Sequence, residues 1–202
     1  MATLPLTRLP AAAEKQAGIR SAVTAANEMP GVARMATLED AEILTALLLD
    51  PKISAPIYTL PKPINRNAVK QFIAQHIEER TNGHGLLFIS VDEKNAAAGY
   101  HDIQFWPEWS ACELGGAIRA DRQGVGAGGG GAIAAFDWLF DVIGVDLICE
   151  TAALDNHRTA RLLERSGFVF HGRVECELPD GGTRPSNYWE MTKEAWMARQ
   201  NR

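Results

Sequence analysis

The sequence predicts an α/β fold, built on one mixed sheet. Three observations predict it: two segments with helical periodicity come first, apolar strand-like runs separated by short turns follow, and one strand–helix–strand crossover comes after a glycine-rich loop. Strands joined by short turns pair antiparallel, whereas a helical crossover joins parallel strands. With 202 residues, the chain suits one domain that carries an appendage.

The composition is that of an ordinary globular protein, with 46% hydrophobic and 22% charged residues. A formal net charge of −5 argues against a nucleic-acid-binding surface and is compatible with a cationic amine substrate. The three cysteines lack close metal-ligand spacing, so we expect no metal, no disulfide and a reducing, cytoplasmic location. No apolar run approaches transmembrane length, and we expect no membrane partner.

Residues 1–33 differ from the rest of the chain. Residues 11–29 are rich in alanine and predict a helix, although prolines punctuate this region and its apolar face is weak. We expect residues 1–33 to form a partly helical N-terminal extension, which docks on the domain or mediates self-association in a homodimer. The domain itself is predicted to occupy residues 34–202.

The first helix of the domain is predicted to begin at Thr37, because Thr37 and Asp40 have the spacing of a capping box. Apolar residues follow at helical spacing, and Pro51 ends the helix. Residues 54–63 carry three prolines and predict a loop, and a second helix is predicted over residues 66–80. Its apolar face consists of Val69, Phe72, Ile73 and Ile77.

Strands are predicted where β-branched, aromatic and aliphatic residues cluster between turn residues. The predicted strands are residues 85–92, 96–105, 111–120, 146–153, 168–178 and 186–191. A helix is expected between the third and fourth strands, with one buried face. Its buried residues are predicted to be Ile133, Phe136, Leu139, Phe140 and Ile143. A short helix over residues 156–165 completes the crossover.

The most informative segment is the glycine-rich stretch between Gln123 and Gly131. A loop with few side chains lets several backbone N–H groups approach one anion, and the following helix adds the positive end of its dipole. Four glycines within a first helical turn would cost roughly 3–4 kcal/mol relative to alanine, so we expect a ligand to compensate. A diphosphate is the expected ligand. The alternative is a flexible loop before a helix that starts later.

Two other phosphate-binding motifs fit this stretch less well. A Walker loop requires Lys and then Ser or Thr after its last glycine, where this chain has Ala132 and Ile133. A dinucleotide fingerprint is formally present at Gly124, Gly126 and Gly129. However, polar and small residues separate it from the preceding strand, and too little chain follows for a doubly wound sheet. A nucleotide-binding enzyme is therefore the less favoured alternative.

The order Gln-x-x-Gly-x-Gly in residues 123–128 resembles the acetyl-CoA pyrophosphate loop of the GNAT superfamily of N-acetyltransferases. Residues 156–159 (Asn-His-Arg-Thr) and 164–168 (Glu-Arg-Ser-Gly-Phe) resemble the signature of its ribosomal-protein acetyltransferase (RimJ/RimL-like) branch. The ending around Trp196 is similar to that branch's closing strand and helix. The resemblance spans residues 34–196.

The resemblance implies the GNAT fold, a mixed, mostly antiparallel central sheet flanked by helices. Two parallel strands, here residues 111–120 and 146–153, would splay apart in a V and hold acetyl-CoA as cosubstrate. Backbone groups of the first strand would pair with its pantetheine arm as an added strand does. The implied cofactor-binding residues are Ala117, Ile118 and Arg119 for the pantetheine, Gln123, Gly124, Val125, Gly126, Ala127, Gly128 and Gly129 for the pyrophosphate, and Asn156 near the thioester.

The chain departs from the usual pattern of this branch at three places. Gly129-Gly130 stands where the branch usually has Thr-Glu, and His171 stands where it usually has Glu. Ser186-Asn187 precedes the last strand where the branch often has Asp. A catalytically silent module that binds acyl-CoA is therefore a second alternative.

The resemblance implies direct attack of a primary amine on the thioester within a ternary complex. The amine would be a protein N-terminus or a small molecule. Thr159 occupies the position of the branch's Ser and is the candidate donor to the leaving sulfur; its alternative role is a helix residue capped by Asn156. Glu113 and His171 are the preferred candidate bases and Glu150 is a third, each with the alternative role of a strand residue that faces solvent. Deprotonation through water, by none of these residues, is a further alternative.

Aromatic side chains in two further segments are candidate acceptor contacts. The turn that carries Trp106 and Trp109 either lines an acceptor groove or forms a rigid hairpin tip. The proline-rich loop around Tyr58 is either an acceptor lid or only a connector.

Overall fold

Eight strands form one sheet in the order β1-β2-β3-β4-β5-β6-β8-β7. The computed structural model describes residues 4–122, 127–178 and 181–200. Of the strands in this part of the chain, β5 and β6 pair parallel and all other neighbours pair antiparallel. The strands are β1 (Glu28–Met29), β2 (Ala33–Met35), β3 (Gly85–Val91), β4 (Ala97–Trp106), β5 (Ala111–Ile118), β6 (Leu147–Ala153), β7 (Val169–Glu177) and β8 (Thr183–Thr192). The predicted mixed, mostly antiparallel sheet is confirmed.

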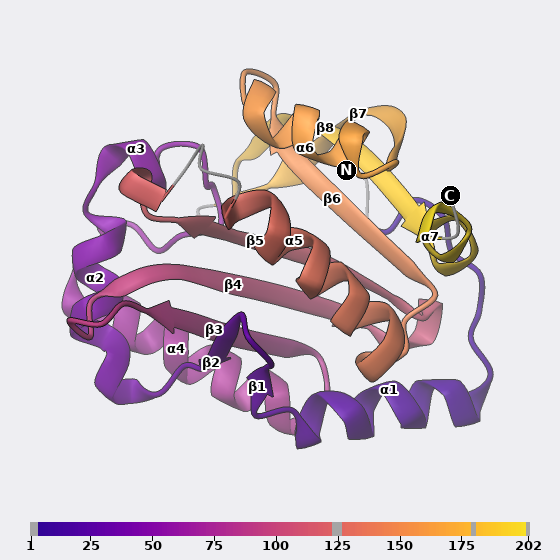
Figure 1. The fold of residues 1–202 in the computed structure, drawn as a ribbon, viewed down its shortest axis with the longest axis horizontal. Helices are drawn as coiled ribbons and strands as arrows, with labels where there is room; N and C mark the ends of the chain where they lie inside the picture. Colours follow the sequence, from indigo (N-terminus) through magenta and orange to yellow (C-terminus); the bar gives the residue numbers. More distant parts are fainter. Residues whose placement is uncertain (1–3, 123–126, 179–180, 201–202) are drawn as a thin grey trace.

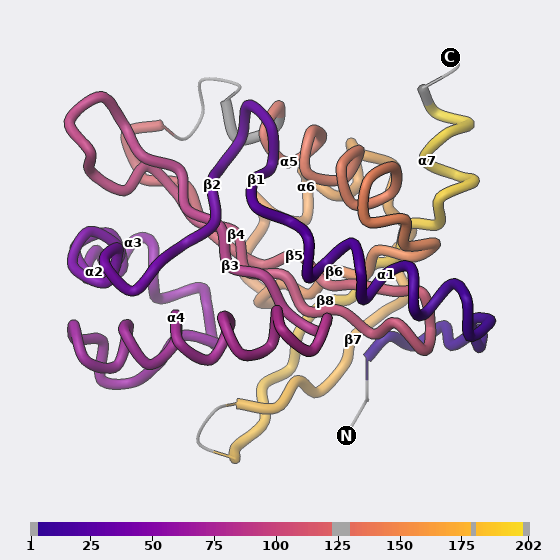
Figure 2. The backbone as a smooth tube through the Cα atoms, turned by 90° about the horizontal axis from the view of Figure 1, so that it is seen from below, coloured from indigo at the N-terminus to yellow at the C-terminus, as the bar shows by residue number. Residues whose placement is uncertain are grey.

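Helices cover both faces of this sheet, with α5 on one face and α2 and α4 on the other (Figures 1 and 2). Each face has its own hydrophobic core: Phe88 and Phe136 lie in the core under α5, and Leu44 and Ile73 in the core under α2 and α4. The helices are α1 (Ala13–Ala25), α2 (Ala41–Leu48), α3 (Pro51–Ser54), α4 (Arg66–Thr81), α5 (Ala127–Trp138), α6 (His157–Arg165) and α7 (Lys193–Gln200). None of the helices in the described ranges is both long and apolar enough to cross a membrane.

The N-terminal part of the chain packs against the domain. Ile19 and Val23 of α1 are buried in the core under α5. The predicted helix over residues 11–29 is wrong at its end, because α1 stops at Ala25 and Glu28–Met29 forms β1. The turn after β1 contains Gly31 with a φ of 72°, a conformation that glycine adopts without strain, and it lets β1 pair with β2. A domain boundary at residue 33 and self-association through residues 1–33 stay predictions.

The predicted helix starts are confirmed on the face covered by α2 and α4. The Thr37 N–H donates to the Asp40 carboxylate at 2.8 Å, as the capping box requires. The helix α4 buries Val69 and Ile73, but the prediction for Ile77 is wrong, since its side chain is 41% exposed. The buried position is taken by His76, whose ring nitrogens hydrogen-bond to Asp102 of β4 and to a backbone carbonyl of its own helix.

The helix α5 begins at Ala127, so the glycine run lies in its first turns and the alternative of a later start is wrong. Its buried face is confirmed at Phe136, whereas Ile133 is only half-buried. The last turn, Leu139–Ile143, is π-helical and buries the remaining residues of the predicted face. This helix therefore crosses the sheet with its glycine-rich end beside β5 (Figure 1).

Candidate active site

The strands β5 and β6 separate after three parallel residue pairs, the last of which joins Glu113 to Cys149. Beyond this pair, β5 continues to Ile118 along β4, and β6 continues to Ala153 along β8. The two strands diverge in a V (Figure 1). The splay predicted between residues 111–120 and 146–153 is confirmed.

Two carboxyl groups lie where the parallel ladder ends. Glu113 is the last residue of β5 that pairs with β6, and Glu150 follows Cys149, the partner of Glu113 on β6. The Thr151 hydroxyl on β6 donates to the Glu113 carboxylate on β5 at 2.6 Å, so a side-chain contact joins the two strands beyond their last backbone pair. The strands therefore open beside Glu113 and Glu150.

The edge of β5 beyond Glu113 carries little side-chain bulk, because Gly115 and Gly116 follow and both are exposed. Gly116 has a φ of 137°, and a Cβ there would collide with the carbonyl oxygen of Tyr100 on β4. Ala117 and Ile118, two of the predicted pantetheine contacts, lie further along this edge and are half-buried. An exposed strand edge of this kind suits pairing with an extended ligand.

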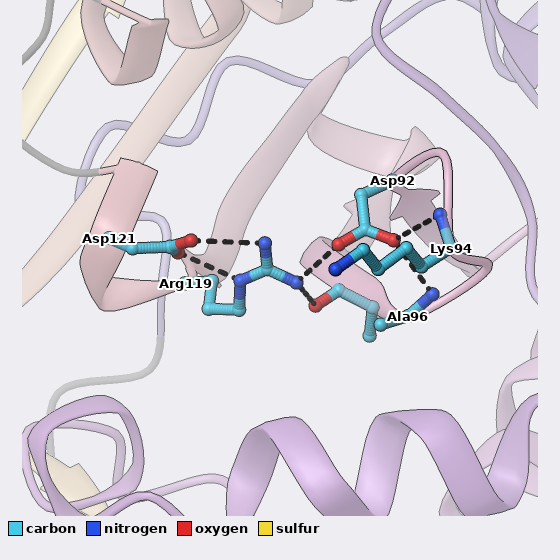
Figure 3. A network of polar contacts seen from close by, with 6 residues as sticks. Asp92, Lys94, Ala96, Arg119 and Asp121 are labelled. Atoms are coloured by element: carbon cyan, nitrogen blue, oxygen red, sulfur yellow. Dashed lines mark hydrogen bonds and ion pairs between the residues drawn. The ribbon is translucent and has the colours of Figure 1, made fainter.

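Arg119 anchors the end of β5 (Figure 3). Its Nη1 donates to Asp92 in the β3–β4 turn and its Nε donates to Asp121, both at 2.8 Å. The hydrogen bond from Arg119 holds the pKa of Asp92 at about 2, so this carboxylate stays ionised. The backbone N–H of Arg119 donates to the Ala98 carbonyl. These contacts fix the direction in which the chain leaves β5 toward the glycine-rich stretch.

The predicted pyrophosphate-binding residues fall partly outside the described part of the chain, which omits Gln123, Gly124, Val125 and Gly126. Ala127, Gly128 and Gly129 form the start of α5. A Cβ on either of the next two residues, Gly130 and Gly131, would meet no atom within 4 Å. The first N–H groups of a helix lack partners within the helix and attract anions. An unobstructed helix start beside the splay fits a diphosphate group.

Glu113 has the environment of a group that exchanges protons near neutral pH. The Thr151 hydroxyl donates to its Oε1 at 2.6 Å. Burial raises the pKa of Glu113 to about 7; the hydrogen bonds from Thr151 lower it, and the nearby charge of Asp102 raises it. A carboxyl group with a pKa near the working pH is suited to general-base catalysis.

Thr151 connects Glu113 to Tyr58, since the Tyr58 Oη lies 2.9 Å from the Thr151 Oγ1. The single Thr151 hydroxyl proton is donated to Glu113, so Tyr58 is the donor in this bond. Burial and the charge of Glu113 raise the pKa of Tyr58 and keep the phenol protonated. Thr151 was not among the predicted site residues, and the loop around Tyr58 was predicted to be either an acceptor lid or only a connector.

Glu150 lies on the opposite face of the sheet from Glu113. Glu150 lies two residues along β6 from both Ile148 and Ala152 and so shares their face, which packs in the core under α5. Its exposed fraction is 6%, so the solvent-facing alternative is wrong for this residue. Its Oε1 has no hydrogen-bond partner among the described residues. Burial raises its pKa well above the ordinary value, and the charge of Glu113 raises it further.

Asn156 and Thr159 stand at the far end of β6. The Asn156 Oδ1 accepts the Thr159 backbone N–H at 3.2 Å and caps α6, which confirms the structural role considered for both residues. Asn156 also lines a cavity of about 250 Å³ together with Asp155 and Arg184. The cap therefore leaves Asn156 within reach of a ligand, and the donor role of the Thr159 hydroxyl stays a prediction.

The structure does not bring His171 to Glu113. His171 lies on β7, and β8 and β6 intervene, which places the two strands roughly 14 Å apart. The side chain is 39% exposed, and its Nε2 lies 3.6 Å from Glu190. Glu190 in turn accepts hydrogen bonds from the backbone N–H of Thr7 (2.9 Å) and from Tyr188 (2.5 Å). His171 thus belongs to a cluster formed with the N-terminal segment.

The turn after β4 packs on the N-terminal segment of its own chain. The Arg8 guanidinium lies 5.8 Å from the Trp109 ring centroid, and the Ala11 N–H donates to the Glu108 carbonyl at 2.9 Å. Trp106 packs in the small core that contains Tyr58. These contacts favour the rigid hairpin tip over an acceptor groove for Trp109.

Comparisons with known proteins agree with this geometry. A family model described as "Acetyltransferase (GNAT) domain" matches residues 32–169. No curated protein matches the sequence. The ribosomal-protein-S5-alanine acetyltransferase from Vibrio fischeri has a similar structure, with a TM-score of 0.68 at 17% identity over 81% of this chain and 93% of that chain.

Two further solved structures share this fold. Mycobacterium smegmatis RimJ, in complex with CoA-disulfide, matches with a TM-score of 0.67 at 17% identity over 80% of this chain and 81% of that chain. The spermidine/spermine N-acetyltransferase SpeG from Vibrio cholerae, in mutant forms, matches with a TM-score of 0.67 at 17% identity over 84% of this chain and 97% of that chain. At these identities the likeness shows the fold.

Proposed function

The chain belongs to the GNAT family of N-acetyltransferases, and from this premise we propose that it transfers the acetyl group of acetyl-CoA to a primary amine, either a protein N-terminus or a small molecule. The observation that carries the proposal is the position of Glu113. It is the last residue of β5 to pair with β6, it receives the Thr151 hydroxyl at 2.6 Å, and its pKa is about 7. A proton acceptor therefore stands where the two strands open.

The residues around the opening fit acetyl-CoA. The edge of β5 at Ala117 and Ile118 would pair with the pantetheine arm, the start of α5 would hold the diphosphate, and Asn156 would contact the arm near the thioester. The supporting observation is that the two exposed glycines of β5, and the two at the start of α5 that a Cβ would not crowd, leave this path unobstructed. Bound acetyl-CoA supplies an acyl group activated as a thioester.

Glu113 is proposed to take the proton from the acceptor's ammonium group, so that the neutral amine attacks the acyl carbon. With a pKa of about 7, Glu113 is ionised in a large fraction of molecules at neutral pH and remains a useful base. The hydroxyl groups of Thr151 and Tyr58 extend from Glu113 toward the loop after α3 and offer a route for the proton. Holding both reactants beside Glu113 supplies a further part of the rate enhancement.

As the amide forms, the attacking nitrogen loses a second proton, which the leaving thiolate takes up. We assign to the Thr159 hydroxyl, at the start of α6, the hydrogen bond that stabilises the leaving sulfur. His171 is left outside the proposed mechanism, because two strands separate it from Glu113 and because it contacts Glu190 instead.

The proposal is tested first by thermal unfolding with acetyl-CoA, CoA, NADH and ATP in parallel. A ligand at a concentration of about 100 times its Kd adds about 2.7 kcal/mol, which raises the midpoint of a chain of this size by roughly 5–10 °C. We expect this rise with acetyl-CoA and CoA only. A rise with NADH or ATP alone would support the nucleotide-binding alternative instead.

A second assay separates an enzyme from a silent acyl-CoA-binding module. Release of free CoA thiol from acetyl-CoA is followed over a panel of primary amines. We expect amine-dependent release with at least one acceptor. Stabilisation by acetyl-CoA without any amine-dependent release would support the silent module.

A further inference from the structure

A cavity of about 390 Å³ opens between the loop that follows α3 and the β7–β8 hairpin. The hairpin projects from the sheet on the side that carries α4 (Figure 2). Most of the cavity wall is apolar, with residues such as Ile57, Leu60 and Pro185. The wall also contains two cationic side chains, Lys62 and Arg184, and no carboxylate among its described residues.

The cavity is connected to the proposed base. Tyr58 lines it, and the Tyr58 hydroxyl is hydrogen-bonded to Thr151, which donates to Glu113. An acceptor in this cavity would therefore lie beside Tyr58, the first hydroxyl group of the chain that ends at Glu113. This connection makes the cavity a suitable place for the body of the acceptor.

Arg184 is held in place over Tyr58. Its guanidinium carbon lies 5.6 Å from the Tyr58 ring centroid, and its Nη1 donates to the Pro56 carbonyl at 3.3 Å. Arg184 also lines the smaller cavity that contains Asp155 and Asn156 before α6, although it forms no ion pair with Asp155. The guanidinium thus stands between the acceptor cavity and the residue expected near the thioester.

Neither Lys62 nor Arg184 forms an ion pair with a carboxylate of the described residues, although the protein as a whole carries a net charge of −5. Glu175 and Glu177 lie on the same hairpin, but they alternate with buried residues that pack toward Tyr58 and so project from the other face. A guanidinium forms strong, charge-assisted hydrogen bonds with carboxylate or phosphate groups. A polycation in this cavity would meet two like charges instead.

We propose that the acceptor is a primary amine that also carries an anionic group, with Arg184 and Lys62 binding the anionic group while the amine reaches Glu113. This inference rests on the proposed function and adds the substrate class to it. An amino acid with a free carboxylate and a peptide with an acidic residue beside its N-terminus share this chemistry. A polyamine lacks it.

The test compares acceptors in pairs that differ by one negative charge. The first pair is a free amino acid and its amide. The second is an amidated tripeptide with Asp at its second position and the same peptide with Asn there. Spermidine is the cationic acceptor. We expect kcat/KM to be about tenfold or more higher for the anionic member of at least one pair than for its partner and for spermidine. The pair that shows the preference identifies the source of the anionic group.

Variants assign the preference to the cavity. Arg184→Gln is expected to raise KM for the anionic acceptor about tenfold, with little change in kcat for the neutral acceptor or in KM for acetyl-CoA. Arg184→Lys keeps the positive charge and should retain part of the preference. Arg173→Gln is the matched control, because Arg173 is an exposed residue of the same hairpin that projects from the opposite face. The unfolding midpoint of each variant shows that it is folded.

Each other outcome is decisive. Equal rates within both pairs, or a preference for spermidine, would overturn this inference and leave the proposed function standing. A rise in KM for acetyl-CoA in Arg184→Gln, with the acceptor preference unchanged, would show that Arg184 serves the cosubstrate and would also overturn it. If no amine is acetylated, the proposed function itself fails and the inference falls with it.

Discussion

Glu113 and Glu150 occupy the two sides of the opening between β5 and β6, and the chain provides them with different partners. Glu113 accepts the Thr151 hydroxyl at 2.6 Å, whereas the Oε1 of Glu150 has no hydrogen-bond partner among the described residues. Burial raises the pKa of both groups, that of Glu113 to about 7 and that of Glu150 well above its ordinary value. The comparison shows that burial raises the pKa of a carboxyl group, and that a donor such as the Thr151 hydroxyl lowers it again toward a range where the group exchanges protons.

The largest effect is expected from replacing the carboxyl group that titrates. Glu113→Gln keeps the size of the side chain and removes the base, so kcat should fall about 10²–10⁴-fold at pH 7. KM for acetyl-CoA should change little, and steady-state thiol release measures both quantities. Glu150→Gln is the matched control. A loss of less than about threefold would place the base elsewhere.

The pH profile sharpens the comparison. Since Glu113 must be ionised to accept a proton, kcat/KM should rise with pH and level off above about pH 7. Thr151 stabilises the ionised form of Glu113, so Thr151→Val should raise the pKa of Glu113. The rising limb of the pH profile, where kcat/KM increases with pH, should then move to higher pH. The variant should therefore lose more activity at pH 6 than at pH 9. Tyr58→Phe retains the hydrogen bond between Thr151 and Glu113 and should shift the rising limb less. Identical pH profiles for the wild type, Thr151→Val and Tyr58→Phe would contradict this role for Thr151.

Glu150 should affect stability more than rate. A carboxyl group whose pKa is raised by folding favours the protonated native state, so its contribution to stability is full below its unfolded pKa of about 4.3 and is lost as the pH rises toward its folded pKa. Glu150→Gln cannot ionise, so the variant does not lose stability in this way as the pH rises. Its unfolding midpoint should exceed that of the wild type at pH 9, by roughly 2–4 °C for each 1 kcal/mol relieved, and the difference should shrink at pH 4–5. Melting curves at both pH values measure this, and a lower midpoint of the variant at pH 9 would contradict it.

The smallest effect is expected at His171. His171 lies on β7 and contacts Glu190 of β8, so two strands separate it from Glu113. His171→Gln should therefore change kcat by less than about twofold and leave the pH profile unchanged. The same thiol-release assay measures it. A disappearance of the limb near pH 7 in this variant would reassign the base from Glu113 to His171.

The sheet and the strand that carries Glu113 were predicted from local periodicity along single segments, whereas the splay was predicted only through the resemblance to the GNAT superfamily. The sequence did not predict that Thr151 and Tyr58 meet Glu113. Hydrogen bonds between β5 and β6 depend on the register of two strands joined by a long crossover, which alternation alone does not specify. Arg184 was not predicted for a similar reason, since it lines the same cavity as Lys62 only because a distant loop packs beside the hairpin.

Gly115-Gly116 is a sequence signal for the open edge of β5. These two glycines lie inside a strand, where glycine often marks a site that another backbone or a ligand approaches closely. In the structure these residues form the exposed edge of β5 immediately after Glu113. The misplaced end of the first helix has a different cause: the composition of residues 26–29 does not exclude helix, and the pairing of β1 with β2 decides their conformation.

The hydrogen bonds between the N-terminal segment and β8 have a consequence for how the protein is made. Leu6 and Thr7 donate to Tyr188 and Glu190, across 182 and 183 residues of sequence. During synthesis, the segment therefore leaves the ribosome long before its partner strand does. It cannot form these hydrogen bonds until β8 has been synthesised, so this pairing is a late step in the folding of the sheet.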